Sequence, residues 1–307
     1  MVIETSDWQP EHRIQLWDTL DEVSRQADAA GARVVLVVDV VHAEQHAAIA
    51  ARYPALRVIR GTEPDGYYAN KHAGILEATS DVVVLTDANC MPQPGWLEAA
   101  IRAFDAAGPR VAAIQGRTFF DRDVLSRLWD AVWWARSTWP RGPLDRLYSG
   151  NNLAFRRAAY LEHPYDPSWP HHTGSERLTG ERMRAAGLQL WFEPEMRVAH
   201  NYSASPRVLV GLARVRGYYV VASRARPTSA RDRAIRRLGW LAPIALPPTM
   251  WPRDVGRLLR RWQSVGLARG DAWKLPAYAV VLLIHAMIAA GGAVRALRGL
   301  PPYRRPS

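Results

Sequence analysis

The chain has 307 residues, a formal net charge of +11 and 48% apolar residues. This composition excludes general disorder, and the length suits one large α/β domain or two smaller domains. The single cysteine, Cys90, excludes an intramolecular disulfide and fits a reducing compartment. The first residues carry early acids and no apolar run, so we expect no secretory signal.

The charge is distributed unevenly along the chain. Residues 1–202 hold 21 Lys and Arg against 26 Asp and Glu, a net charge of −5, whereas residues 203–307 hold 19 against 3, a net charge of +16. A concentrated positive region is typical of a segment that binds a polyanion, either nucleic acid or an anionic bilayer. Because the composition also changes near residue 202, we expect a domain boundary there.

The first 115 residues alternate short apolar runs with helical patterns. The runs rich in β-branched residues predict strands at 34–40, 57–60, 81–87 and 111–119. The segments between them predict helices at 43–54, 69–79 and 96–108. This alternation predicts an α/β fold with a mostly parallel sheet flanked by helices, which binds ligands beyond the carboxyl ends of its strands. The glycine-rich motifs of dinucleotide oxidoreductases and P-loop NTPases are missing after these strands, which argues against both classes.

Residues 121–139 predict an amphipathic helix that contains or adjoins four tryptophans. Packing over the sheet accounts for at least two of them. The others, with Trp133 as the candidate, could form a wall for an acceptor, because amphipathic rings stack well on sugars and lipid headgroups.

Three segments carry residues suited to chemistry, and the first is 86–90. A buried strand ends there in Asp87, and Asn89 lies two positions further. In an extended segment residues i and i+2 point the same way, so both oxygens could face one hard cation such as Mg²⁺. A turn motif is the alternative, because Asp and Asn are common in turns without any ligand.

The other two segments are 149–157 and 174–200. The first contains a Gly-Asn-Asn sequence that turn chemistry alone explains. In the second, Glu176 opens a predicted helix that ends at Gly187, where a carboxylate could stabilise the helix N-terminus or act as a general base. His200 closes a strand-like run, and a structural role and a ligand role both remain open for it.

The order of these segments resembles the family 2 glycosyltransferases of the GT-A fold, over roughly residues 1–220. The nucleotide-binding half, about 1–115, is similar in its strand ending at Asp39, in HAG at 72–74 and in TDANCMPQPGWL at 86–97. The acceptor half, about 116–202, is similar in GNNLAFRR at 150–157 and in Glu176 ahead of an R-x-x-x-x-G sequence. His200, after WFEPEMRVA, completes the pattern.

The resemblance implies an inverting transfer of a sugar from a nucleotide sugar to an acceptor hydroxyl. It implies donor contacts at Thr5, Asp39 and Asp87. It implies an Mg²⁺ or Mn²⁺ ion held by Asp87, Asn89 and His200. Lys71 could in addition reach a phosphate as a point charge.

On the acceptor side, the resemblance implies that Glu176 deprotonates the acceptor hydroxyl and that Asn152 and Arg156 shape the site. The sequence departs from the family pattern at several positions, among them His72 in place of the usual asparagine, and two departures concern the expected catalytic residues. The metal motif is Asp-x-Asn rather than Asp-x-Asp, which removes one anionic ligand, and Ser175 precedes Glu176 where the family has a Glu-Asp pair. These departures keep open a catalytically degenerate GT-A-like module that binds a partner at a membrane. A nucleotidylyltransferase is the other alternative, but its glycine-rich loop is missing from residues 1–15.

Residues 203–307 predict a basic helical region that associates with a membrane. The stretch 275–294 has no formal charge and would span about 30 Å as a helix, roughly one hydrocarbon core. The stretch 238–251 is apolar but short and contains prolines, which suits an interfacial piece. Two buried helices of a soluble domain are the alternative.

Arginines that alternate with apolar and tryptophan-rich stretches favour an anionic leaflet over nucleic acid as the partner. No signature of a nucleic-acid-binding module occurs in the sequence either. We therefore expect the protein at the cytoplasmic side of the cell membrane, either peripheral or anchored by one C-terminal hydrophobic helix.

Overall fold

The structure is a computed structural model that describes residues 1–6, 16–61, 66–119, 138–169, 174–200, 206–222, 234, 237–260 and 269–300. The chain divides into two compact units. The first contains residues 1–119 and 139–201, and the second contains residues 120–138 and 202–307. Each unit has its own apolar core.

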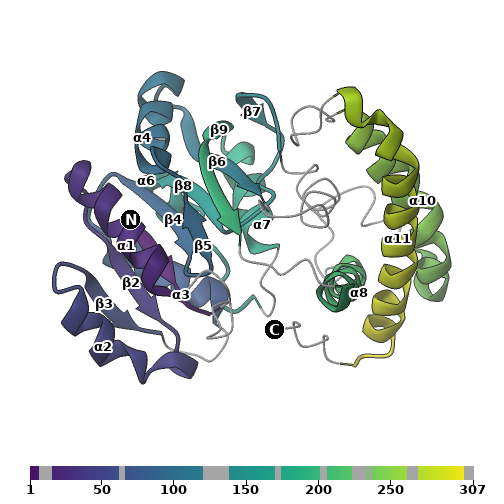
Figure 1. Ribbon diagram of the computed structural model, residues 1–307, viewed down its shortest axis with the longest axis horizontal. Coiled ribbons are helices and arrows are strands. Elements are labelled where there is room, and N and C mark those ends of the chain that lie inside the picture. The colour runs from purple at the N-terminus through teal and green to yellow at the C-terminus, as the bar shows by residue number, and fades with distance from the viewer. Residues whose placement is uncertain are drawn as a thin grey trace. The chain divides into compact units, whose positions relative to one another are not determined.

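The first unit is built around one sheet, which has nine strands among the described residues (Figure 1). The strands are β1 (Val2–Glu4), β2 (Val35–Val38), β3 (Arg57–Arg60), β4 (Val82–Asp87), β5 (Cys90–Pro92), β6 (Val111–Phe119), β7 (Gly142–Leu144), β8 (Asn152–Arg156) and β9 (Gln189–His200). Their order is β3-β2-β1-β4-β8-β6-β9-β5, and β7 pairs with β9. The strands from β3 to β4 are parallel, as predicted. The rest of the sheet is mixed, because β8 runs antiparallel to both β4 and β6.

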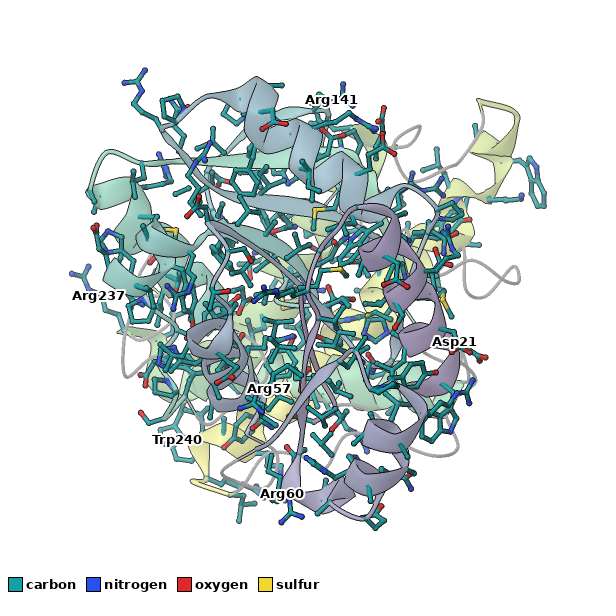
Figure 2. All side chains as sticks on the ribbon, turned by 90° about the vertical axis from the view of Figure 1, so that its left-hand side faces the viewer. Asp21, Arg57, Arg60, Arg141, Arg237 and Trp240 are labelled. Atoms are coloured by element: carbon teal, nitrogen blue, oxygen red, sulfur yellow. The ribbon has the colours of Figure 1, made fainter. Side chains whose placement is uncertain are left out.

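Helices cover both faces of this sheet. They are α1 (Leu16–Ala29), α2 (Gln45–Arg52), α3 (Tyr67–Glu77), α4 (Trp96–Ala107), α6 (Arg157–Glu162) and α7 (Ser175–Ala185), with a short 3₁₀ turn η1 (Val40–His42) after β2. One core packs α1, α2 and α4 on one face, and the other packs α3, α6 and α7 on the opposite face. Successive residues of β1, Val2 and Ile3, enter opposite cores, which explains why the strands read as continuous apolar runs. Charged side chains such as Asp21, Arg57 and Arg141 lie on the outside (Figure 2).

The expected α/β architecture is confirmed, and the helices and strands predicted within 34–119 are present with ends within two residues of those predicted. The helix predicted to start at Glu176 is α7. Helix α1 and strand β5 were not predicted. The helix predicted at 121–139, with Trp133 on it, lies almost wholly outside the described residues.

The second unit is helical where it is described. Its helices are α8 (Pro206–Ala222), η3 (Gly239–Leu241), α10 (Ala242–Arg260), η4 (Arg269–Lys274) and α11 (Leu275–Leu297). Helix α11 packs against both α8 and α10. A buried ion pair at 2.6 Å joins Arg216 on α8 to Asp254 on α10. Of the described helices, one, over 272–297, has the length and the apolar composition of a membrane span, properties that a buried helix of a soluble protein shares.

Glycines let the backbones of α8 and α11 touch. A Cβ atom added at Gly217 would overlap the carbonyl oxygen of Ala289, and one added at Gly292 would overlap the carbonyl oxygen of Arg214. Small residues at a helix crossing permit this close approach. No atom lies within 4 Å of a Cβ added at the neighbouring Gly291, so the close approach of α8 and α11 does not depend on a glycine there.

These two adjacent glycines give a matched test of the crossing. Gly292→Ala should destabilise the second unit by about 1–3 kcal/mol, because overpacking pushes the helices apart. Gly291→Ala should be neutral or stabilise by up to about 1 kcal/mol, because alanine favours a helix over glycine. Thermal unfolding of the two purified variants measures both effects. Equal melting temperatures for the two variants would contradict the crossing.

Candidate functional site

Polar residues gather at the carboxyl ends of β1 and β2, where the parallel strands predict a ligand site. The backbone N–H of Asp39 donates to Oγ1 of Thr5 at 2.9 Å. One carboxylate oxygen of Asp39 accepts from the backbone N–H of Val41, and the other accepts from Nδ2 of Asn70 at 2.8 Å. Thr5 and Asp39 therefore lie together, as their predicted shared role requires, and Asn70 joins them from α3.

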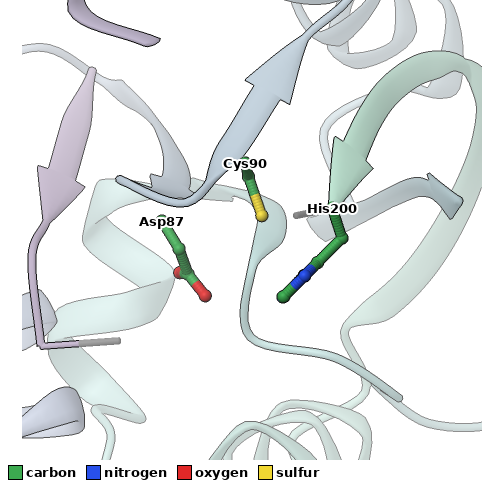
Figure 3. Close-up of side chains that lie close together, drawn as sticks. All are labelled: Asp87, Cys90 and His200. Carbon is green, nitrogen blue, oxygen red and sulfur yellow. The ribbon is translucent and has the colours of Figure 1, made fainter. Parts of the chain in front are cut away.

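A second group lies at the end of β4 and contains Asp87, Cys90 and His200 (Figure 3). All three residues are buried, and their candidate ligand atoms lie within 4.8 Å of one another. Two of the three predicted metal ligands, Asp87 and His200, thus meet in one place. The third, Asn89, is buried in the turn beside them, and its Oδ1 accepts from the Cys90 thiol at 3.7 Å. Cys90 was not predicted to take part.

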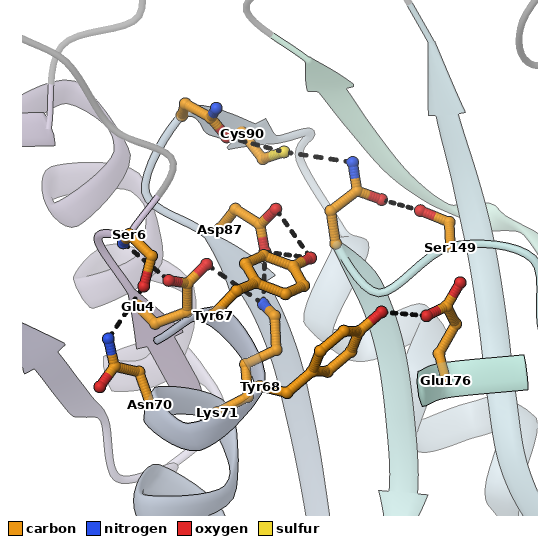
Figure 4. A network of polar contacts seen from close by, with 12 residues as sticks. Glu4, Ser6, Tyr67, Tyr68, Asn70, Lys71, Asp87, Cys90, Ser149 and Glu176 are labelled. Atoms are coloured by element: carbon orange, nitrogen blue, oxygen red, sulfur yellow. Dashed lines mark hydrogen bonds and ion pairs between the residues drawn. The ribbon is translucent and has the colours of Figure 1, made fainter. Parts of the chain in front are cut away.

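Two carboxylates of this region lie side by side, because Glu4 on β1 is the register partner of Asp87 on β4. The ammonium of Lys71 contacts Asp87 and lies 3.4 Å from Oε1 of Glu4 (Figure 4). The Tyr67 hydroxyl donates to the Asp87 carboxylate at 3.2 and 3.3 Å from its two oxygens. Each of the three charged side chains is at most 2% exposed.

The electrostatics of this group favour a charged Lys71. Burial acts to lower the pKa of Lys71, but the carboxylates of Asp87 and Glu4 together outweigh it and raise the pKa above its ordinary value. Lys71 therefore carries a fixed positive charge inside the first unit. Such a charge can neutralise carboxylates and attract a phosphate oxygen.

Glu176, at the N-terminus of α7, is buried. Its Oε2 accepts from the Tyr68 hydroxyl and from the backbone N–H of Gly174 at 2.8 Å. Burial raises the pKa of the Glu176 carboxyl, and these two hydrogen bonds oppose the shift only in part. A carboxylate whose pKa is raised in this way is a stronger base than an exposed one, which suits proton abstraction from a hydroxyl.

The first turn and a half of α3 connects these groups. Tyr67 and Lys71 reach Asp87, and Tyr68 reaches Glu176 (Figure 4). Asn70 reaches Asp39. Residues 67, 70 and 71 share one helix face through their i+3 and i+4 spacing, which brings the contacts to Asp87 and Asp39 to one side. Sequence reasoning missed Tyr67, Tyr68 and Asn70. The signal was the aromatic and polar run YYANK directly after Gly66, at the start of a helix.

The residues predicted on the acceptor side differ in position: Asn152 pairs with Thr86, next to Asp87, and Arg156 lies four residues further along β8. Asn152 accepts from Nε1 of Trp96 at 2.8 Å and donates to the Met196 carbonyl at 2.9 Å, so its side chain ties α4 to β9. Arg156 pairs with Val82, which is the first residue of β4, whereas Asp87 is the last. Trp133 lies outside the described residues.

Arg156 also has a structural role. Its guanidinium donates to the carbonyls of Phe104, Gly108 and Val111. These contacts satisfy carbonyl groups at and after the C-terminus of α4. The structure therefore does not bring Arg156 to the group around Asp87 and Glu176.

Comparisons with known proteins agree with this architecture. Residues 15–164 match the family model described as glycosyl transferase family 2. The chain is similar in structure to the mannosyltransferase PcManGT from Pyrobaculum calidifontis in complex with GDP-Man and Mn²⁺, with 18% identity over 96% of this chain and 86% of that one and a TM-score of 0.58. It is also similar to S. aureus TarS 1–349, with 12% identity over 97% and 90% of the two chains and a TM-score of 0.50. No curated protein matches the chain in sequence.

The family match and the two solved structures together confirm the GT-A-like α/β fold of the first unit. At these identities the solved structures support the fold and not the activity. The roles of individual residues in this chain therefore rest on its own geometry.

The buried charge group gives a second prediction. Lys71→Met should destabilise the protein by about 3–5 kcal/mol, because it leaves the carboxylates of Glu4 and Asp87 buried without their cation. The control is Arg57→Met, which removes an exposed ion pair to Glu77 at 2.7 Å and should change stability by less than about 1 kcal/mol. Chemical denaturation of both variants measures the difference. A Lys71→Met variant as stable as Arg57→Met would show that the buried pair is not needed for folding.

Proposed function

We propose that the chain is an inverting glycosyltransferase that moves a sugar from a nucleotide sugar to an acceptor hydroxyl. The observation that carries this proposal is the continuous contact from Asp87 through Tyr67 and Tyr68 to Glu176. Two consecutive residues of one helix thereby contact both Asp87, which suits the donor diphosphate, and Glu176, the proposed base. The family match over residues 15–164 supports the same assignment.

The donor site of this proposal lies at the carboxyl ends of β1, β2 and β4. Asp39 and Thr5 would contact the nucleoside, because they directly follow the carboxyl ends of β2 and β1, which are neighbours in the sheet. Lys71 and Asp87 would lie at the diphosphate. PcManGT carries GDP-Man in its complex, and for this chain we propose a nucleotide sugar without choosing the base or the sugar.

A divalent metal fits the group at the end of β4. Asp87 and His200 offer a carboxylate oxygen and an imidazole nitrogen within one buried cluster. Mn²⁺ binds both kinds of ligand, whereas Mg²⁺ prefers the oxygen. PcManGT holds Mn²⁺ together with its donor. When bound, such an ion supplies positive charge that stabilises a diphosphate leaving group.

The chain's own residues account for the remaining chemistry. Glu176 takes the proton of the acceptor hydroxyl as the acceptor oxygen bonds to the anomeric carbon and the bond from that carbon to the donor phosphate breaks. A single displacement of this kind inverts the anomeric configuration. The hydrogen bonds from Tyr68 and Gly174 hold the carboxylate in place. Lys71 contributes a fixed positive charge beside the leaving group.

The role of Glu176 can be tested by an isosteric change. Glu176→Gln should lower turnover by on the order of 10²–10⁴-fold with donor binding retained, because an amide cannot accept the proton. Glu181→Gln on the same helix is the control and should leave turnover unchanged. Release of the nucleoside diphosphate, measured with a panel of donors and acceptors, gives the rates. Near wild-type turnover in Glu176→Gln would remove Glu176 from the mechanism.

We further propose that the transferase occupies residues 1–202 and that residues 203–307 bind the cytoplasmic face of a membrane. The net charge of +16 in the second segment favours anionic headgroups. Trp240 and Trp273 are 66% and 76% exposed, and Trp is enriched at membrane interfaces. The apolar helix α11 lies in the same segment. A membrane-proximal acceptor would follow from this location.

Vesicle flotation tests the membrane proposal. The purified chain should float with vesicles that contain anionic phospholipid and should float less with zwitterionic vesicles, because headgroup charge contributes to binding. Trp240→Ser and Trp273→Ser together should weaken the flotation. Recovery of the whole protein in the unbound fraction with both vesicle types, at low salt and without detergent, would contradict membrane association.

A further inference from the structure

The strand pairing places Cys90 and His200 on the same face of the sheet. Cys90 opens β5, His200 closes β9, and the two are direct register partners in an antiparallel pair. Directly opposed residues in such a pair have Cβ atoms about 4.5–5.5 Å apart, so their side chains run alongside each other. Asp87 completes the group from the end of β4, three residues before Cys90 (Figure 3).

The spacing of the three candidate ligand atoms is close to that of a metal site. A tetrahedral ion with bonds of about 2.0–2.3 Å holds its ligand atoms roughly 3.5 Å apart. The sulfur, nitrogen and oxygen atoms here lie within 4.8 Å of one another before any ion is placed. Each atom would therefore have to move by at most roughly one ångström to reach the spacing of a tetrahedral site.

An oriented amide also points to a metal-bound sulfur. Nδ2 of Asn151 donates to Sγ of Cys90 at 3.7 Å (Figure 4). The orientation of this amide is fixed, because Oδ1 of Asn151 accepts from the hydroxyls of Thr118, at 3.0 Å, and Ser149. Support of a ligand atom by an oriented hydrogen-bonding neighbour is typical of metal sites.

The net charge of the buried groups suits a divalent cation. The carboxylates of Glu4 and Asp87 and the ammonium of Lys71 together carry a net charge of −1. A thiolate at Cys90 brings the charge of these four groups to −2, which one divalent ion neutralises. Buried charges are stable only when they are paired, so ion and thiolate support each other.

We infer that Cys90 is a ligand of the metal ion and that its sulfur gives this site a preference for thiophilic ions such as Zn²⁺ and Co²⁺ over Mg²⁺. The thiolate supplies the anionic ligand that the Asp-x-Asn sequence lacks at Asn89. Sulfur ligands select softer ions, whereas Mg²⁺ requires oxygen. When the ion binds, the thiol proton leaves to solvent. This inference rests on the proposed function for the purpose of the site, but its geometry does not depend on it.

Cobalt absorption tests the inference directly. Co²⁺ added to the full-length protein under a phosphine reductant should produce a near-ultraviolet thiolate-to-cobalt charge-transfer band that saturates at one ion per chain. Cys90 is the single cysteine, so no other residue can produce this band. Zn²⁺ should abolish the band, and a large excess of Mg²⁺ should not.

Two variants test the contributions of Cys90 and His200 to metal binding separately. Cys90→Ser should lose the band and bind Co²⁺ at least about tenfold more weakly. Loss of a residue that only supports a ligand already weakens metal binding by about this factor, and loss of the ligand itself should weaken it at least as much. His200→Ala should weaken Co²⁺ binding in the same way with the thiol still present. Circular dichroism tests whether both variants fold. If either variant does not fold, the wild-type spectrum alone decides the role of Cys90.

The possible outcomes separate the metal site from the transferase. Co²⁺ bound without the charge-transfer band, or no Co²⁺ binding at all, would overturn the role of Cys90 even in an active transferase. A band in a protein that turns over no nucleotide sugar would uphold the ligand and contradict the proposed function instead.

Discussion

Two carboxylates that lie side by side in the interior impose the main constraint on the first unit. The parallel pairing of β1 and β4 sets Glu4 opposite Asp87, and each would be unstable there without a cation. Lys71 supplies that cation from α3. The register of two strands and the placement of one helix are thereby coupled to a single buried charge.

The placement of α3 in turn organises the rest of the site. With Lys71 held at Asp87, Tyr67 reaches the same carboxylate, Tyr68 reaches Glu176 and Asn70 reaches Asp39. Glu176 on α7 and the strand ends of the sheet are therefore contacted by the first turn and a half of one helix. The chain shares its fold with glycosyltransferases to which its identity is low, and in this chain the contacts of α3 hold the candidate site together.

The sequence predicted the fold, and several of the residues that it suggested for a site lie together in the structure. Buried parallel strands read as runs of Val and Leu, so β2 and β4 were predicted. Asp87 was selected because it ends such a run, and Asp39 was assigned by resemblance. Asn152 and Arg156 were assigned by resemblance alone, and in the structure their side chains bond to Trp96, to Met196 and to the segment at and after the end of α4. Cys90 was missed because its meeting with His200 depends on a pairing of strands more than a hundred residues apart, which no local pattern records.

Donor binding tests the central claim most directly. Thermal unfolding of the full chain with UDP-, GDP- and dTDP-sugars, with and without Mn²⁺, should show one nucleotide sugar that raises the melting temperature by mass action, more strongly with Mn²⁺. Asp39→Ala should remove that rise, because Asp39 lies where the nucleoside is expected. A melting temperature that no nucleotide sugar changes, with or without Mn²⁺, would contradict the account.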